Sequence, residues 1–452
     1  MMRRVCVVIP TYQRECDAAR QARRFARMRS VARVLVIDQA DTLSADEHFS
    51  GVLNEEPKVR LIVQPNLGGS GGYARGMLEA LAFPGEAVLL SDDDAVLSEE
   101  ALETMVLYQQ AAPRPTIMGT GMISAEDPHL LVSQAETVWP RDFMWGPADG
   151  LAEPLDLTEP AEVQDDVLRL RTQPNYTGWW GTLLPPGAVT ELGLPAPYFL
   201  KWDDAEYGLR ATQRGYDTVV LPQARVTHPT WGAYKTQMDW TARILHRNRL
   251  ATAAAYRAGE GVIVSSLAHQ LKHILAGHYL TATLWAAGID QFLSGPHQWL
   301  GSDLTHARSD GQAIAERWNH RYSSPEQPPT ATHCAPLPLR RAVVRAVTGL
   351  LEARLRRRVV LHVGVSEVSW RTTLGADLVV MTHPDGSNAG TLTANTATAR
   401  ALLARTVNQH WHMLRRWRVL RSMYGRALPT VTTPEAWRLM IARAEAEQRP
   451  GD

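Results

Sequence analysis

Three consecutive aspartates, Asp92, Asp93 and Asp94, directly follow the apolar run Ala-Val-Leu-Leu. In an extended chain, side chains two residues apart point to the same side, so Asp92 and Asp94 would face one ligand together. Two such carboxylates suit a divalent cation, Mn²⁺ or Mg²⁺, which in turn neutralises the pyrophosphate of a nucleotide diphosphate. Like charges this close are unfavourable without a compensating cation or donors. The triplet therefore predicts a cation-assisted nucleotide site.

A glycine-rich loop, Asn66 to Gly76, follows an apolar run and opens a helical pattern. Gly69, Gly71 and Ala74 fit the spacing of a dinucleotide-binding loop, and an acid stands about 20 residues further on. An NAD(P)-dependent oxidoreductase using Gly69-Ser70-Gly71 is therefore an alternative. Against it, the loop follows the third predicted strand rather than the first. A turn that only packs helix on sheet is also open, although such glycines let the backbone approach a phosphate.

A second cluster of acids, Asp203 and Asp204, lies beside aromatic residues just before a predicted helix. Inverting sugar transfer requires one carboxylate to take the proton of the acceptor hydroxyl, and Asp204 is the predicted base. Asp203 would orient it or cap the helix. His228 is a candidate third metal ligand, because imidazole suits Mn²⁺. Isolated histidines more often have no such role.

Three tryptophans, Trp179, Trp180 and Trp202, offer flat apolar faces to a sugar acceptor. Packing in the core is the competing interpretation for them.

The first hundred residues alternate buried strands with helices. The predicted strands are 4–10, 33–38, 59–64 and 87–92, and helices are predicted at 17–28 and 71–83. Runs that are apolar on both faces are typical of a parallel sheet covered by helices. Ligands of such sheets bind at the carboxyl ends of the strands. The predicted nucleotide-contacting residues at these ends are Thr11, Arg14, Asp38, Gln39, Asn66, Gly68, Gly69 and Asp93.

Beyond residue 239 the pattern becomes helical, over 238–258 and 262–293. A proline-rich stretch, 323–338, predicts a linker. The tail would form a small mixed domain with a helix at 396–425. The predicted domains are therefore 1–235, 236–325 and 339–452.

Net charge is zero, yet residues 336–426 carry 15 arginines, no lysine and four acids. Clusters such as Arg354, Arg356, Arg357 and Arg358 are compatible with peripheral contact with an anionic membrane or a phosphate-bearing acceptor. A solvated helix face, or contact with the acidic half of the same protein, is at least as well supported. No nucleic-acid partner is expected, and homo-oligomerisation is open.

Three cysteines, Cys6, Cys16 and Cys334, are too few for a disulfide framework and indicate a reducing compartment. The first apolar run stops at Pro10, which favours a buried strand over a signal peptide. No stretch reaches the roughly 18 apolar residues that a membrane span needs. A cytoplasmic enzyme is expected, peripheral on the inner face of the plasma membrane if the arginines meet lipid.

Nine short motifs along the first 250 residues occur in a fixed order. They are TYQR (11–14), IDQA (37–40), NLGGSGGYARG (66–76), SDDD (91–94), WWGTLLP (179–185), KWDDAEYGLRA (201–211), GYDTVVLP (215–222), His228 and HRNRL (246–250). This series resembles the galactofuranosyltransferases of actinobacterial cell-wall galactan synthesis, which are inverting family-2 enzymes with a GT-A fold.

The resemblance implies an α/β catalytic domain of the GT-A type, Rossmann-like with a mainly parallel sheet, followed here by a largely helical C-terminal region. It implies UDP-galactofuranose as donor, Mn²⁺ or Mg²⁺ as cofactor, and a lipid-linked galactan as acceptor. The residues it assigns are, for UDP, Arg14, Gln39 and Asn66; for the metal, Asp92, Asp94 and His228; for the base, Asp204; and for the acceptor, Trp179 and Trp180.

Two alternatives stay open beside it. One is a family-2 enzyme with another UDP- or dTDP-sugar, and the other is a carbohydrate-binding protein without catalysis.

Overall fold

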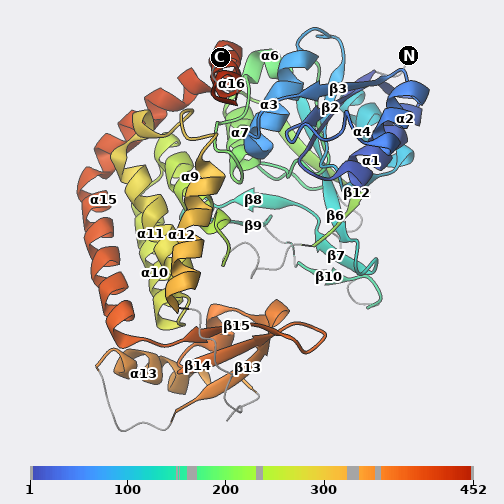
Figure 1. The fold of residues 1–452 in the computed structure, drawn as a ribbon. Helices are drawn as coiled ribbons and strands as arrows, with labels where there is room; N and C mark the ends of the chain where they lie inside the picture. The colour runs from blue at the N-terminus through green and yellow to red at the C-terminus, as the bar shows by residue number, and fades with distance from the viewer. Residues whose placement is uncertain are drawn as a thin grey trace. The chain divides into compact units, whose positions relative to one another are not determined.

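The computed structural model describes residues 4–148, 151, 153–159, 171–230, 238–322, 335–351 and 358–448. The chain divides into two compact units, coloured along the sequence in Figure 1. Unit 1 consists of Met1–Thr230, Leu300–Thr305 and Arg426–Asp452, and unit 2 of Trp231–Trp299 and His306–Gly425. The C-terminal segment is therefore part of the same compact unit as the N-terminal residues. The three predicted domains remain a prediction.

Four parallel strands start the sheet of unit 1, in the spatial order β4-β1-β2-β3. They are β1 (Val5–Thr11), β2 (Val31–Asp38), β3 (Val59–Val63) and β4 (Ala87–Leu90). All four residues of β4 and six of the seven in β1 are buried, as expected for strands covered on both faces. The predicted α/β class is confirmed; these four strands are parallel as expected, but antiparallel pairs of later strands make the whole sheet mixed.

The second half of the sheet brings a distant strand to the same edge. Strand β11 (Thr182–Leu184) is antiparallel to both β4 and β6 (Thr116–Ser124), so β4 and β6 run the same way. Strand β12 (Asp217–His228) is parallel to β6. The carboxyl ends of β4 and β12 therefore lie at one edge of the sheet. A shorter strand, near 219–221, follows from the sequence pattern; β12 continues to His228 because it pairs with β6 and β5 (Val96–Leu97).

The remaining elements of unit 1 are α1 (Glu15–Arg27), α2 (Glu47–Glu55), α3 (Gly68–Ala80), α4 (Glu99–Ala111), β7 (Leu130–Ser133), β8 (Glu136–Val138), β9 (Trp145–Pro147), β10 (Leu155–Asp156), α6 (Ala188–Leu192), α7 (Asp203–Gln213) and α16 (Pro434–Gln448). Helix α16 is anchored by Trp437, which is fully buried and donates from Nε1 to the Pro195 carbonyl at 2.9 Å. The Thr432 carbonyl accepts from the Leu194 amide at 2.8 Å. These bonds attach the C-terminal segment to unit 1.

Unit 2 is built mainly from helices: α9 (Thr241–Ala255), α10 (Gly261–Leu275), α11 (Tyr279–Ser294), η2 (Pro296–Gln298), α12 (Ala307–Tyr322) and α15 (Thr396–Val431), whose last turns belong to unit 1. The helical run predicted at 262–293 is two helices, because Gly277 adopts a left-handed conformation (φ +77°) between them. Arg247 of the HRNRL motif is buried, lies 4.0 Å over the Trp299 ring and donates to Gln291 at 2.7 Å. This motif therefore packs the helices of unit 2.

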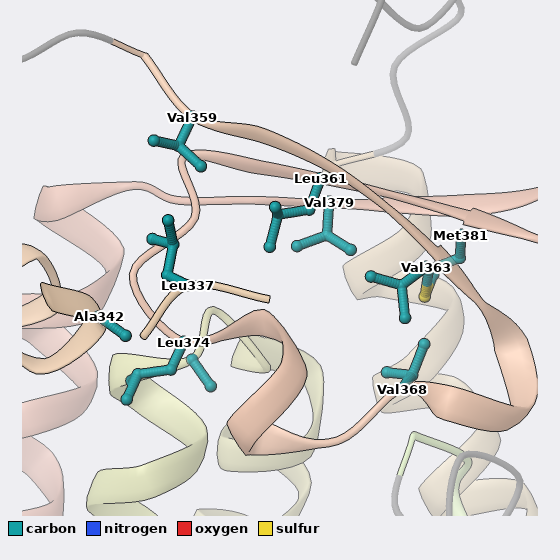
Figure 2. Close-up of a cluster of buried hydrophobic side chains, with 10 residues drawn as sticks. Leu337, Ala342, Val359, Leu361, Val363, Val368, Leu374, Val379 and Met381 are labelled. Carbon is teal, nitrogen blue, oxygen red and sulfur yellow. The ribbon is translucent and has the colours of Figure 1, made fainter. Parts of the chain in front are cut away.

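A small sheet completes unit 2, with β13 (Val360–Gly364) parallel to β14 (Leu378–Thr382) and β15 (Asn388–Thr393) antiparallel to it. Helices α13 (Leu339–Gly349) and α14 (Trp370–Thr373) and the turn η3 (Val365–Glu367) accompany it. Figure 2 shows Leu361, Val363, Val379 and Met381 of the strands facing Leu374 and other apolar side chains below them. The core beneath these strands also includes Ala276, next to the end of α10. Among the described residues, no helix is both long and apolar enough to cross a membrane.

Candidate metal and transfer site

Asp92, Asp94 and His228 meet at the carboxyl ends of β4 and β12. His228 Nε2 lies 3.1 Å from Asp94 Oδ1 and 3.6 Å from Asp92 Oδ2, and one ligand atom from each residue lies within 4.8 Å of the others. His228 Nδ1 is 2.7 Å from the Pro229 carbonyl oxygen, which can only accept a hydrogen bond. In the neutral ring this fixes the hydrogen on Nδ1 and leaves the Nε2 lone pair facing the carboxylates. The set fits a divalent cation that takes oxygen and imidazole ligands.

The same carboxylates hold a proton on His228 when no cation competes for it. Burial alone lowers the pKa of His228, but the hydrogen bonds and charges of Asp92 and Asp94 outweigh it and raise the pKa to about 10. For Asp94, burial raises the pKa, but the contacts with His228 and Arg14 outweigh it, so the net pKa is lowered. A cation at this place would have to displace the imidazole proton, so its affinity would fall at low pH.

Asp93 points away from this triad. Thr11 donates to Asp93 Oδ2 at 2.7 Å, and Arg14 Nε lies 3.6 Å from Asp93 Oδ1. Burial raises the pKa of Asp93 to about 7. Arg14 also donates to Asp94 at 2.6 Å and is 41% exposed, so it is still open to a ligand. Thr11 and Arg14, both predicted to contact the nucleotide, therefore hold the acidic triplet in place.

Three further predicted nucleotide residues shape the neighbouring loops. Asp38 is fully buried, and its two oxygens accept four backbone N–H bonds from residues 40–43. Gln39 accepts from the Leu67 amide at 3.0 Å and donates to the Gly68 carbonyl at 3.1 Å. Asn66 accepts from the Gly68 amide at 3.0 Å. These bonds set the loops at the ends of β2 and β3, and direct contact with a nucleotide stays a prediction.

The glycine loop packs against the segment that carries the predicted base. Gly68 has φ +70°, and a Cβ there would lie 2.0 Å from the Phe199 carbonyl oxygen. The Ser70 amide donates to that oxygen at 3.1 Å, and the Ser70 hydroxyl donates to Asp203 Oδ2 at 2.9 Å. A Cβ on Gly69 would be 3.4 Å from Leu200. Glycine is therefore required at Gly68 for this close approach.

The base segment itself is strained. Phe199, Lys201 and Trp202 all have positive φ, between 67° and 74°, a conformation that costs roughly 1–3 kcal/mol each and is concentrated at functional sites. Helix α7 begins directly after them. Asp204 Oδ1 accepts from the Ala205 amide at 2.7 Å. Burial raises the pKa of Asp203 and of Asp204, and for Asp203 the neighbouring Asp204 adds to it.

The predicted acceptor tryptophans are mostly enclosed, with exposed fractions of 5% for Trp179, 8% for Trp180 and 3% for Trp202. Trp179 packs edge-on against Tyr73 and Tyr207, at ring distances of 5.0 and 5.7 Å. Trp180 donates to the Thr120 carbonyl at 3.2 Å. Little of these three side chains is open to a sugar, and their role in acceptor binding stays a prediction.

Two further residues act on the site, Tyr73 through a hydrogen bond and Glu136 through its charge. Tyr73 lies within the quoted glycine motif, yet no spacing rule marks it; its hydroxyl is 2.6 Å from Asp92 Oδ1. Glu136, on β8, accepts from the Tyr176 hydroxyl at 2.5 Å, and its charge raises the pKa of Asp204. Burial raises the pKa of Glu136 itself to about 7. Glu136 stands alone in the sequence, so only folding identifies it.

Comparison with known families gives the class of protein to which this sheet and its acidic edge belong. The model of the "Glycosyltransferase like family 2" matches residues 3–253, and that of "Galactofuranosyltransferase-2, domain 3" matches residues 262–443. The chain belongs to the family-2 glycosyltransferases and, within them, is related to the galactofuranosyltransferases. Because the chain belongs to this family, the interpretation of its glycine loop as part of an NAD(P)-dependent oxidoreductase is not supported.

Two curated relatives carry the name galactofuranosyltransferase GlfT2. The chain is 30% identical to the protein of Mycolicibacterium smegmatis, over 98% of this chain and 73% of the relative. It is also 30% identical to that of Mycobacterium tuberculosis, over 99% of this chain and 74% of the relative. Among solved structures, GalNAc-T7 with UDP, GalNAc and Mn²⁺ has a TM-score of 0.44 at 14% identity, covering 74% of this chain and 61% of that chain.

Proposed function

We propose that this enzyme transfers galactofuranose from UDP-galactofuranose to a hydroxyl of a glycan or lipid-linked glycan acceptor, with inversion at the anomeric carbon. The observation that carries the proposal is the convergence of Asp92, Asp94 and His228 within 4.8 Å at the carboxyl edge of the sheet. The names of the two GlfT2 relatives support galactofuranose as the sugar. UDP as the carrier is implied by the motif resemblance.

Asp92, Asp94 and His228 would hold Mn²⁺ or Mg²⁺. Bound there, the cation would supply charge neutralisation of the UDP leaving group. Arg14 adds a positive charge next to Asp94 with its guanidinium partly open to solvent. At the start of α3, the amides of Gly68 and Ser70 already donate to Asn66 and to the Phe199 carbonyl, so Arg14 is the group proposed to meet the phosphates.

Asp204 would take the proton of the acceptor hydroxyl as that oxygen attacks the anomeric carbon. Burial raises the pKa of Asp204, which makes its carboxylate a stronger base than that of an ordinary aspartate. The Asp203 carboxylate, fixed by Ser70, would keep the first turn of α7 in register with the glycine loop. The acceptor would approach along Trp179, Trp180 and Trp202.

A donor panel tests this proposal. The full chain is incubated with Mn²⁺, a galactofuranosyl glycolipid acceptor and, in parallel, UDP-galactofuranose, UDP-galactopyranose, UDP-glucose and a dTDP-hexose, with mass spectrometry of the product. Transfer from UDP-galactofuranose alone, lost with a chelator, is the expected result. Transfer from another donor in preference would refute the sugar, and full activity with the chelator would refute the role of the metal.

We also propose that α13 is the surface through which the arginine-rich region meets anionic lipid at the inner face of the membrane. The outward stripe consists of Leu339, Val343, Val344 and Val347 of α13 and of Leu351 just beyond its end, and these side chains are 42–71% exposed. The small Ala342 faces the core instead. Arg340 and Arg341 are exposed beside the stripe, and residues 335–351 contain no acid.

An outward apolar stripe flanked by arginines is the pattern of a helix that lies in the interface of an anionic bilayer. Arg345 is engaged elsewhere, by Asp377 at 2.6 Å. Arg354, Arg356 and Arg357 lie outside the described residues, and Arg358 is exposed at the start of the β13 segment.

Vesicle sedimentation distinguishes a stripe on α13 that binds lipid from one that forms an interface between two copies of the chain. Full-length protein should bind vesicles of phosphatidylglycerol and phosphatidylcholine, and Val344→Ser with Val347→Ser should weaken binding about 10-fold or more. Leu107→Ser, at an exposed leucine of α4, is the matched control. Unchanged binding by the double variant refutes the lipid role of α13, and a change in oligomeric mass without a change in vesicle binding assigns the stripe to a second copy.

A further inference from the structure

Tyr73 contacts both the candidate metal ligand Asp92 and the predicted acceptor residue Trp179. It projects from α3, is 4% exposed, and its hydroxyl lies 2.6 Å from Asp92 Oδ1 and 3.0 Å from the Trp179 carbonyl oxygen. Its ring meets the Trp179 ring edge-on at 5.0 Å. Both oxygens are acceptors and a phenol has one hydrogen, so Tyr73 donates to one at a time. The shorter, charge-assisted bond to Asp92 is the stronger of the two.

The two oxygens of Asp92 are therefore used differently. Oδ1 receives the Tyr73 hydroxyl, while Oδ2 is the oxygen that faces His228 Nε2 at 3.6 Å. Asp94, the other carboxylate of the triad, is held from two sides by His228 and Arg14 and is 14% exposed. Asp92 is 42% exposed, and its bond to the Tyr73 hydroxyl, at 2.6 Å, is shorter than its 3.6 Å contact with His228. Tyr73 therefore holds this carboxylate more closely than His228 does.

We infer that Tyr73 is a positioning residue that orients Asp92 Oδ2 toward the divalent cation. Its contacts with both residues also link this ligand to Trp179. The inference rests on the proposed metal-dependent transfer. Groups that hydrogen-bond to a metal ligand fix its orientation, and their loss weakens metal affinity by about 10- to 100-fold. Tyr73 itself touches neither the cation nor the reacting atoms.

Titration of the full-length protein with MnCl₂ alone, followed by the electron paramagnetic resonance of free Mn²⁺, measures the affinity directly. Tyr73→Phe keeps the ring against Trp179 and should weaken the Kd for Mn²⁺ by about 10- to 100-fold. Tyr207→Phe is the matched control: its ring packs on the same tryptophan at 5.7 Å, and its hydroxyl has no hydrogen-bond partner among the described residues. Its Kd should equal that of the wild type.

Raising the Mn²⁺ concentration should restore turnover in Tyr73→Phe, which a loss of folding would not allow. In an Asp92→Ala background, Tyr73→Phe should weaken Mn²⁺ binding no further, because the ligand that it positions is gone. An unchanged Kd in Tyr73→Phe, or an equal further loss in the Asp92→Ala background, overturns the inference alone. A wild-type protein that binds no Mn²⁺ overturns the proposed metal-dependent function as well.

Discussion

The hydroxyl of Ser70 donates to a carboxylate oxygen of Asp203 at 2.9 Å, although 133 positions separate the two residues. Ser70 belongs to the first turn of α3, which opens with the glycine loop, and Asp203 to the first turn of α7. Both side chains are buried. Because the adjacent Ser70 amide also binds the Phe199 carbonyl, the loop proposed to meet the donor and the segment proposed to carry the base form one assembly.

Asp204→Asn should bind donor normally and lose transfer by about 10²- to 10⁴-fold, because the amide accepts no proton. The measurement is kcat for transfer beside the Kd for UDP with Mn²⁺. Asp127→Asn, at an exposed aspartate, controls for loss of a surface charge. Near-normal kcat in Asp204→Asn would exclude this residue as the base and direct attention to Glu136.

His228→Ala and Asp94→Ala should abolish the Mn²⁺-dependent part of the thermal stabilisation by UDP, since each removes one of the three clustered ligands. Any stabilisation that UDP gives without metal should persist. His129→Ala, at an exposed histidine, serves as the control. If the Mn²⁺-dependent shift of Tm survives in both variants, the cation binds elsewhere.

Gly68→Ala should destabilise unit 1 by more than about 2 kcal/mol, since a left-handed conformation costs an L-residue roughly 1–2 kcal/mol and the new Cβ also meets the Phe199 carbonyl. Urea denaturation gives the free energy of unfolding. Gly85→Ala, where nothing lies within 4 Å, should stay within about 0.5 kcal/mol of the wild type. Equal effects of the two substitutions would show that the loop rearranges freely.

Unit 2 should lose stability on mild acidification. His273 and His278 are buried with their Nδ1 atoms 3.4 Å apart, and His278 Nε2 lies 2.8 Å from Thr373. Burial lowers the pKa of His273 to about 3 and that of His278 to about 4. A histidine in the unfolded chain has a pKa near 6.5. Between about pH 6.5 and pH 4 the unfolded chain therefore binds more protons than the folded protein, and the free energy of unfolding decreases as the pH is lowered.

His278→Gln, which retains an N–H donor but does not titrate, should flatten this dependence. Hydrogen exchange of α10 and α14, corrected for the intrinsic rate, localises the effect to unit 2. Burial raises the pKa of Asp93 and Asp203 in unit 1, which acts in the opposite sense, so the exchange of unit 1 is the internal comparison. Identical pH slopes for wild type and His278→Gln would rule out His278 as an origin of the effect.

The α/β class and the order of the first strands follow from local pattern. The predicted strand 33–38 lies within β2, and 59–64 and 87–92 overlap β3 and β4, because continuous apolar runs of strand length permit little else. Boundaries that depend on partners were less predictable. The length of β12 is set by its pairing with β6 and β5, and the break at Gly277 by a single backbone conformation within an apolar run.

The types and order of residues predicted the chemistry of the site: the acidic triplet, the glycine loop, the paired aspartates and a late histidine. They did not predict which atoms face each other, because distances between residues over a hundred positions apart are set by sheet order and loop packing. Only the fold turns Asp93 toward Thr11 and away from the triad, commits Asp38 to four backbone amides, encloses the tryptophans, and places Tyr73 on Asp92. Sequence determined the reactive groups, and tertiary structure decided their partners.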